Sequence, residues 1–436
     1  MPIINIKQFN MKRLIKQFSL HIFSNIKFSF ETFFTILIIL GIPLNLYKNR
    51  FYDNSWTVGE WLISYAGGFV RRGLPGELIH FISEKYSLSP ILLIWIISSV
   101  ALLSLASLIL YFCKNLFDKS FLLSQLIILA PLSEDYFIRK DAFLVFFYGL
   151  SLLILRSFYE KKFNKLITIF SVNFISIIAI FSHESYGIWG LPSIVLIFYI
   201  FERYNQKTIF KSLLYSTLFL MPSIFSFVLC WLFKGNQDQS LIIHQSWQSL
   251  SEILPSVTAL YKKDPSGAIA AIGWGTSQVF TSSLLSQFNL FIFWHPGMWL
   301  LTIYVAIKLF IGKKKDLNQK LKRTLLCSQL IAFIPMFLFV DIGRWIFMWL
   351  TSSALLFSFL YQTFGFKKLS YFSSTLKGQQ ILAKIIPQFS SIRNYNYVLL
   401  FFGIPHCCWS LGRYLVSNPI GFGIKNIIFY TKFLFS

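Results

Sequence analysis

Charged residues are scarce in this sequence, and acidic ones are scarcer than basic ones. Asp, Glu, Lys and Arg make up 13% of the 436 residues, whereas soluble domains carry about 25%. This shortage excludes an ordinary soluble domain. Because 55% of the residues are hydrophobic and they gather in long runs, the composition predicts an all-α, polytopic integral membrane protein.

Patterned cysteines and a leader cleavage site are also missing. The five cysteines lie in or beside apolar segments without the spacing of metal ligands, so we expect no disulfide framework, no metal site and no cofactor. The basic segment 1–30 runs into an apolar stretch without a small-residue cleavage site. It is therefore predicted to be a cytoplasmic amphipathic segment rather than a cleaved signal.

Long apolar runs are what the sequence has in quantity. They predict about 11 transmembrane helices, with limits of 10 and 12, in a single membrane domain over residues 1–436. The predicted crossings lie near residues 31–47, 90–113, 120–133, 142–155, 166–182, 186–201, 212–233, 290–311, 324–340, 345–364 and 396–411. Two long outer segments remain, 48–89 and 234–289, and both contain amphipathic or apolar pieces. Within the second, 268–288 is expected to be a re-entrant or interfacial helix, or a further pair of crossings.

Basic residues alternate with the predicted crossings in a regular way. Alternation from a cytoplasmic N-terminus places every Lys- and Arg-rich loop on the inner side, as the positive-inside rule requires. The formal net charge of +23 is then explained by anchors that face anionic lipid, and a nucleic-acid partner is not expected.

Three predicted outer hairpin tips carry polar residues, namely 134–141, 182–185 and 341–345. Only 36 residues separate Lys119 from Arg156, and two crossings need roughly 17 to 20 residues each, so the first tip stays at the membrane boundary. Charges at that depth are costly unless they pair or line a wet cavity. We therefore expect the tips to converge on one outward-facing cavity, with His183 accessible at its rim.

A guanidinium pair lies in the first outer segment. Arg71 and Arg72 belong to the glycine-rich stretch GGFVRRGLPGE, residues 67–77. Such a pair outside the membrane predicts an anion site, and the expected anion is a phosphate. Further candidates for phosphate binding are Arg139, Lys140 and Arg344.

Each candidate also has a structural interpretation. Residues 139–141 could form a hairpin cap whose long side chains reach the interface, and Asp341 could pair with Arg344 along one helix. The arginine pair could bind lipid phosphate. Four tryptophans of the outer segments are interpreted as interface anchors: Trp56, Trp61, Trp247 and Trp274.

One order of motifs along the chain resembles the core of bacterial polysaccharide (O-antigen) polymerases of the Wzy and EpsG type. It begins with Ile138-Arg139-Lys140-Asp141-Ala142, continues through a short crossing, a basic loop and a second crossing, and ends with Ser182-His183-Glu184-Ser185. The resemblance covers roughly residues 130–200. It implies a multi-pass protein of the bacterial plasma membrane that joins undecaprenyl-diphosphate-linked glycans at the periplasmic face. In that family's chemistry the arginines hold the diphosphate, no metal is used, and a chain-length regulator is a partner. His183 and Glu184 are the candidates for the base.

Two alternatives stay open. The sequence is also similar to the GT-C superfamily of lipid-dependent glycosyltransferases, which implies an acidic base in the first outer loop, where Asp53 or Glu60 fits. Other acidic candidates at the outer tips are Glu134, Asp135, Asp141 and Asp341. The second alternative is a transporter or flippase of lipid-linked oligosaccharide, whose coupling charges are expected near the midplane on broken helices.

Overall fold

The computed structural model of the chain describes residues 40–50, 54–114, 122–123, 127–132, 137–204, 208–251, 263–274, 342–369 and 419–435. Every regular element within these ranges is a helix, which confirms the all-α prediction. Outside them lie Asp53, Glu134, Asp135 and Asp341, together with the crossings expected at 290–311, 324–340 and 396–411.

Among the described residues, five helical stretches are long and apolar enough to cross a membrane. They are α3 (Pro90–Cys113), α5 (Asp141–Tyr159), α6 (Lys165–Ser182), the stretch Ser185–Arg203 formed by α7 (Ser185–Trp189) and α8 (Leu191–Tyr204), and 343–363 of α17 (Ile342–Leu369). A sixth is α9 (Ile209–Phe219) with α10 (Met221–Leu232), which meet at a bend of 63°. The chain is thus a multi-pass membrane protein. Five of the predicted crossings are found in the described residues, or six if the bent α9–α10 pair is one span. The total of eleven is not confirmed.

The described residues of the crossing expected at 120–133 do not form a regular helix. Residues 127–132 form turns and are all buried. Pro131 disfavours a helix here, because it has no N–H to donate to the carbonyl oxygen four residues earlier. Irregular backbone at membrane depth is tolerated where protein covers it, and this segment is covered.

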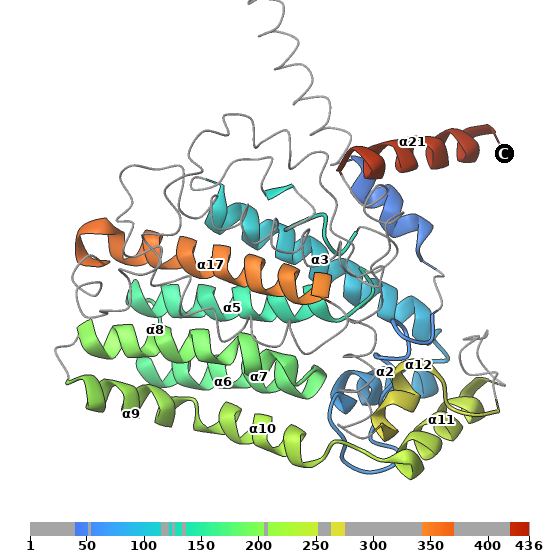
Figure 1. Cartoon of the computed structure of the whole chain (residues 1–436), viewed down its shortest axis with the longest axis horizontal. Coiled ribbons are helices and arrows are strands. Elements are labelled where there is room, and N and C mark those ends of the chain that lie inside the picture. The colour runs from blue at the N-terminus through green and yellow to red at the C-terminus, as the bar shows by residue number, and fades with distance from the viewer. Residues whose placement is uncertain are drawn as a thin grey trace, which may run out of the picture.

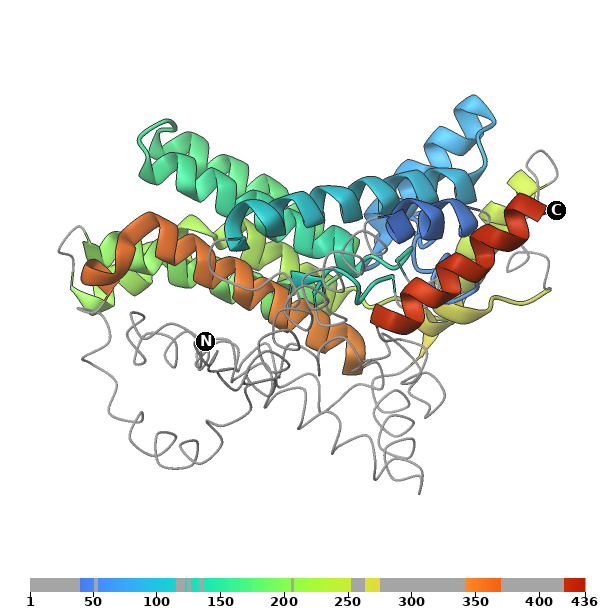
Figure 2. The same cartoon turned by 90° about the horizontal axis from the view of Figure 1, so that it is seen from above.

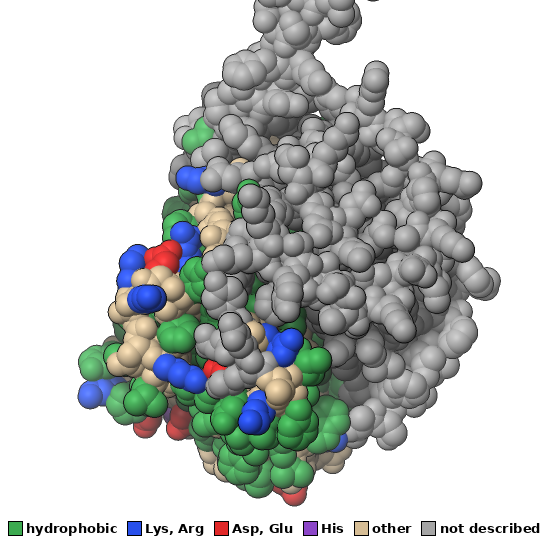
Figure 3. Space-filling view, turned by 90° about the vertical axis from the view of Figure 1, so that its left-hand side faces the viewer, with side chains coloured by type: hydrophobic (Ala, Val, Ile, Leu, Met, Phe, Trp, Pro, Cys, Tyr) green, Lys and Arg blue, Asp and Glu red, His purple; other side chains and the backbone are tan. Residues whose placement is uncertain are grey.

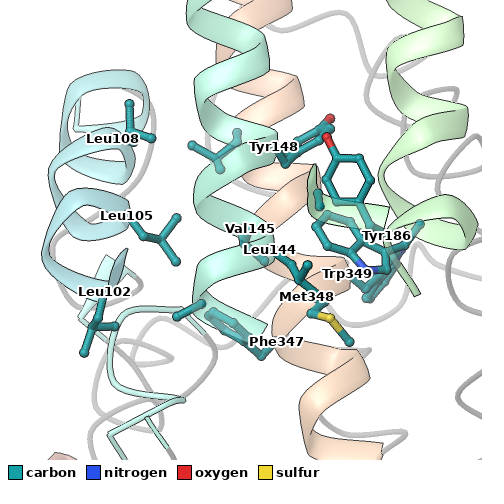
Figure 4. Packing of buried hydrophobic residues seen from close by; sticks show 14 of the residues in the cluster. Leu102, Leu105, Leu108, Leu144, Val145, Tyr148, Tyr186, Phe347, Met348 and Trp349 are labelled. Atoms are coloured by element: carbon teal, nitrogen blue, oxygen red, sulfur yellow. The ribbon is translucent and has the colours of Figure 1, made fainter. Parts of the chain in front are cut away.

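Helices α3, α5 and α17 form the centre of the bundle. Helix α5 packs against α3, α6 and α17, and Figure 4 shows leucines of α3 facing Leu144, Val145 and Tyr148 of α5 beside the aromatic residues of α17. The approach of α3 to α5 is close because α5 carries Gly149. A Cβ there would lie 2.8 Å from Cδ1 of Leu108.

The bundle has two unlike ends. At the site end, where α5 begins and α6 ends, helices α2 (Gly73–Tyr86), α11 (Gln237–Ser251) and α12 (Gly267–Ala270) gather, with the 3-10 turn η2 (Ala271–Gly273); this is the right-hand end in Figures 1 and 2. The opposite, basic end carries the exposed Lys161, Lys162, Lys165 and Lys211. Figure 3 looks onto the left-hand side of the molecule and shows such basic side chains between apolar ones.

The outer segments are folded onto the site end rather than spread along an interface. Trp61 and Trp247 are buried, and their indole N–H groups donate to the carbonyl oxygens of Ile138 and Leu62. Their interpretation as interface anchors was therefore wrong, because tertiary packing supplies acceptors that sequence does not reveal. Trp56 and Trp274 are exposed and meet edge to face.

Two further helical pieces lie beside each other near the site end. Residues 40–48 are helical and contact α21 (Pro419–Phe435). The approach is again at a glycine, because a Cβ at Gly41 would lie 2.9 Å from Phe422 and 2.7 Å from the amide of Asn426. The expected helix at 268–288 is represented in the described residues by α12 and η2, which are too short to cross a membrane.

Candidate functional site

A cluster of charged side chains lies at the site end. It is formed by Glu60, Arg71, Arg72, Lys140, Asp141, His183, Glu184 and Arg344, and we call these residues the charged cluster. They come from four separate parts of the chain: the first outer segment, the start of α5, the link between α6 and α7, and the start of α17. The predicted convergence of the polar tips is found in these described residues.

The turn before α2 directs the two arginines into the cluster. Arg72 is the N-cap of α2 and has φ 69°, a left-handed conformation that is uncommon outside glycine. Gly73 follows it because a Cβ at that position would lie 2.3 Å from the ring of Tyr65. The backbone N–H of Arg71 donates to the carbonyl oxygen of Phe233 at 3.0 Å, so the end of α10 also fixes this turn.

Glu184 is held between the arginines. Arg72 donates from Nε to Oε2 at 2.8 Å and from Nη2 to Oε1, and Arg71 donates from Nη1 to Oε1 at 3.1 Å. Burial by itself would raise the pKa of Glu184, but the positive charges of Arg72 and Arg71 outweigh it and lower that pKa well below its usual range. Glu184 is thus ionised and firmly paired.

Glu60 forms the other centre of the cluster. Its Oε1 lies 3.0 Å from Nε2 of His183, 3.5 Å from Nη2 of Arg344 and 4.0 Å from Nη1 of Arg72. Burial would raise the pKa of Glu60, but Arg344 in the first place, then His183 and Arg72, lower it well below its usual range. In each of these three pairs the nearest carboxylate oxygen is Oε1, and no hydrogen bond to Oε2 is found within the described part of the chain.

His183 is a neutral donor to Glu60 in this arrangement. Its Nδ1 accepts the backbone N–H of Ser185 at 3.1 Å, which assigns the proton of the neutral ring to Nε2. Burial, with the charge of Arg72, lowers the pKa of His183 despite the opposing effect of the two carboxylates. Both ring nitrogens are therefore engaged.

Arg344 reaches Asp141 across 203 residues of sequence. Its Nε and Nη2 donate to the two carboxylate oxygens at 2.7 and 2.8 Å, a bidentate pair at the joint start of α5 and α17. The side chains are 13% and 1% exposed. The predicted local pair would have joined Arg344 to Asp341, which lies outside the described residues; the observed partner is Asp141.

Lys140 ties together two segments of the cluster. Its Nζ donates to the carbonyl oxygens of Ser182 at 3.0 Å and Arg72 at 3.3 Å, and it lies over the ring of Trp61. Burial lowers the pKa of Lys140 to about 7. Its side chain and that of Arg139 are buried, so the interpretation of 139–141 as a cap that reaches the interface was wrong. Phosphate binding by Lys140 stays a prediction, since its ammonium contacts main-chain oxygens.

The link between α6 and α7 is covered more than the sequence suggested. His183 and Glu184 are 7% and 8% exposed, whereas a hairpin tip at the rim was expected to be accessible. The first outer segment folds over this link and supplies Glu60 and both arginines as its partners. No spacing pattern in the sequence marks that long-range contact.

The cluster is suited to anion and proton chemistry. Three guanidinium groups face three carboxylates at close range, and His183 lies 3.0 Å from Glu60 and 3.6 Å from Glu184. In the described part of the chain, no group of three or more His, Cys, Asp or Glu side chains is arranged to hold a metal ion. The two described cysteines, Cys113 and Cys230, are buried free thiols.

Comparison with known protein families finds one similarity. A family model described as "Uncharacterised membrane protein Rv1490" matches residues 30–242. This range contains seven members of the charged cluster and ends before Arg344. No curated protein and no solved structure matches the chain. The similarity agrees with a membrane protein and carries no chemistry with it.

Proposed function

We propose that the protein is a membrane glycosyltransferase that uses a sugar linked to a polyprenyl phosphate or diphosphate, with Glu60 as the proton acceptor. The observation that carries this proposal is the environment of Glu60. A buried, ionised carboxylate has His183 and two arginines close to Oε1, while no hydrogen bond to Oε2 is found among the described residues. An acceptor hydroxyl placed at Oε2 would have its proton acceptor preorganised.

The proposed reaction is a substitution at the anomeric carbon of the donor sugar. The acceptor hydroxyl oxygen forms a bond to that carbon and its proton passes to Oε2 of Glu60. The bond from the carbon to the phosphate oxygen breaks, and the electron pair leaves with the phosphate. Guanidinium groups of the cluster stabilise the charge that develops on this leaving group, as preorganised donors do elsewhere.

The geometry favours Glu60 over the two bases expected first. Both oxygens of Glu184 are occupied by two guanidinium groups, so an acceptor hydroxyl has no free oxygen to approach there. His183 would have to release the backbone N–H of Ser185 before Nδ1 could accept a proton. We therefore assign His183 the role of orienting Glu60. This supports the GT-C-like alternative over a polymerase that depends on His183.

The proposed side of the reaction is the outer face of a bacterial plasma membrane. The site end carries the cluster, while the opposite end carries the exposed lysines that the positive-inside rule assigns to the cytoplasm. A polyprenyl-linked donor would reach the cluster along the membrane boundary. The substrate would feed surface polysaccharide synthesis.

Glu60→Gln tests the proposal with a near-isosteric change. We expect transfer in membranes supplied with a polyprenyl-linked donor to fall by about 10² to 10⁴-fold, the usual cost of a lost general base. Glu84→Gln is the matched control, because Glu84 is an exposed carboxylate in the same outer segment whose described ion pair is with His80.

The surface glycan ladder separates the enzyme classes. A polymerase defect leaves single repeat units, whereas loss of a single transfer shortens every chain by the same sugar. Full transfer by the Glu60→Gln protein would contradict the proposal. Loss of transfer in His183→Ala with normal transfer in Glu60→Gln would restore the polymerase interpretation.

The transporter alternative has one feature in its favour. The α9–α10 pair is bent at Leu220, and the side chain of Asn173 bonds the freed groups at this break: it donates to the carbonyl oxygen of Phe219 and accepts from the N–H and hydroxyl of Ser223. Broken helices occur at transporter binding sites. However, the charged cluster lies at the end of the helices rather than at this break. Normal ladders in both variants would favour transport.

A further inference from the structure

We propose that Glu184 occupies the phosphate subsite of the cluster, so that a phosphate ligand binds Arg71 and Arg72 by displacing the Glu184 carboxylate. This inference rests on the proposed function only in taking the ligand to carry a phosphate. It assigns Glu184 the role of an internal competitor rather than that of a base.

The contacts of Glu184 are those that a phosphate would make. Arg72 meets the two oxygens of the carboxylate with Nε and Nη2, and Arg71 adds a third contact from Nη1. Guanidinium groups bind two oxygens of a phosphate with the same planar fork. The carboxylate therefore fills a site whose donor geometry suits either anion.

The arginine pair is more open than the other bidentate pair of the cluster. The side chains of Arg71 and Arg72 are 24% and 25% exposed against 13% for Arg344, and Glu184 is 10% exposed against 1% for Asp141. Among the described residues, the side chain of Arg71 makes one hydrogen bond, from Nη1 to Glu184. Its remaining N–H groups can therefore donate to a ligand. A ligand can thus approach Arg71 first and then exchange with Glu184 at Arg72.

Charge balance gives a reason for the exchange. Glu60, Asp141 and Glu184 match Arg71, Arg72 and Arg344 in number, so a phosphate that entered beside all three carboxylates would meet nearly balanced charge. If the Glu184 carboxylate turns toward water, two guanidinium groups are released for the ligand. The side chain of Glu184 is 10% exposed, so part of it already faces solvent and it can turn further in that direction.

The test is a binding measurement on the full chain in detergent, with inorganic pyrophosphate and farnesyl diphosphate as probes. Removing the competitor in Glu184→Gln should tighten binding by about tenfold, which corresponds to about 1.4 kcal/mol. Glu184→Asp keeps the charge but shortens the side chain, and we expect a smaller gain in the same direction. Glu84→Gln removes a carboxylate from the same side of the protein and should change nothing.

The double variant Glu184→Gln with Arg71→Gln should lose the gain, because the released donor is then missing. A gain with both probes supports a subsite for the phosphate itself, and a gain confined to farnesyl diphosphate supports a lipid-borne source. Unchanged or weaker binding in both Glu184 variants, with melting temperatures near that of the parent protein, would overturn the inference, as would no binding by any variant.

Glu184→Asp decides the question if Glu184→Gln fails to fold. The readout is binding, so it is independent of transfer. If Glu60→Gln transferred normally, the proposal that Glu60 is the base would fail. Tighter phosphate binding by Glu184→Gln would still support the present inference. Conversely, Glu60→Gln could abolish transfer while Glu184→Gln shows no gain, and only the present inference would then fail.

Discussion

The two ends of the helical bundle use the same charged residue types differently. At the basic end, Arg156 and Lys162 pair with Glu160 within a few residues of sequence at the surface, and the exposed Lys165 reaches the buried Glu202 across 37 residues. At the site end, Arg72 pairs with Glu184 and Arg344 with Asp141 over more than a hundred residues, and the carboxylates are buried. Exposed local pairs contribute little to stability. Buried distant pairs fix how segments meet, and breaking one is costly.

Breaking the Arg344–Asp141 pair should have the largest effect. Asp141→Asn removes the bidentate, buried counter-charge of Arg344 and leaves it the longer contact with Glu60, and we expect a loss of about 3 to 5 kcal/mol in unfolding free energy. Thermal or denaturant unfolding in detergent measures it. Lys162→Ala is the control at the basic end, where the pair is exposed and no change in melting temperature is expected. Equal losses in both variants would erase the distinction between the two ends.

A smaller, pH-dependent effect is expected from Lys140. Burial lowers its pKa to about 7 from an ordinary value of 10.5, so between these pH values the unfolded chain binds more protons than the folded one. Stability should therefore rise with pH from about 7 to 10.5, and the charging cost is fully present below pH 7.

Melting temperatures measured across this range, for the parent protein and Lys140→Met, isolate the effect. The parent should show a steeper rise with pH than the variant, because other titrating groups are common to both. Parallel curves would mean that the Lys140 ammonium is not destabilised by burial, and its contacts with the carbonyl oxygens of Ser182 and Arg72 would then offset the desolvation.

Single cysteine substitutions at exposed positions test the orientation in the membrane, and they should have the smallest effect on the protein itself. In a background without native cysteines, Asp238→Cys at the start of α11 and Lys162→Cys at the basic end are both exposed positions. An impermeant thiol reagent added to intact cells should label the first and spare the second. His183 is a poor labelling position because it is buried. The reverse pattern would place the cluster in the cytoplasm and remove the outer-face proposal.

Sequence patterns and packing contributed differently to the charged cluster. Every member was a candidate from its residue type and its place at a predicted outer boundary. The pairing of Glu60 with His183 was not foreseen, because the two residues had been assigned to competing enzyme classes. Likewise, Arg344 was matched to its neighbour Asp341 rather than to Asp141. A pattern in one segment carries no information on which side chain of another segment will face it.

The sequence by itself determined that this is an all-α membrane protein and where five of its long apolar helices run, because an uncharged run of sufficient length has a strong preference for lipid and must satisfy its own backbone. It also determined that polar residues gather at one boundary, since charge at that depth is costly. Tertiary structure alone decided that Trp61 and Trp247 are buried, that residues 127–132 form turns, and that Glu184 lies between two arginines. Those outcomes depend on the packing of segments distant in sequence, which hydropathy and local spacing do not encode.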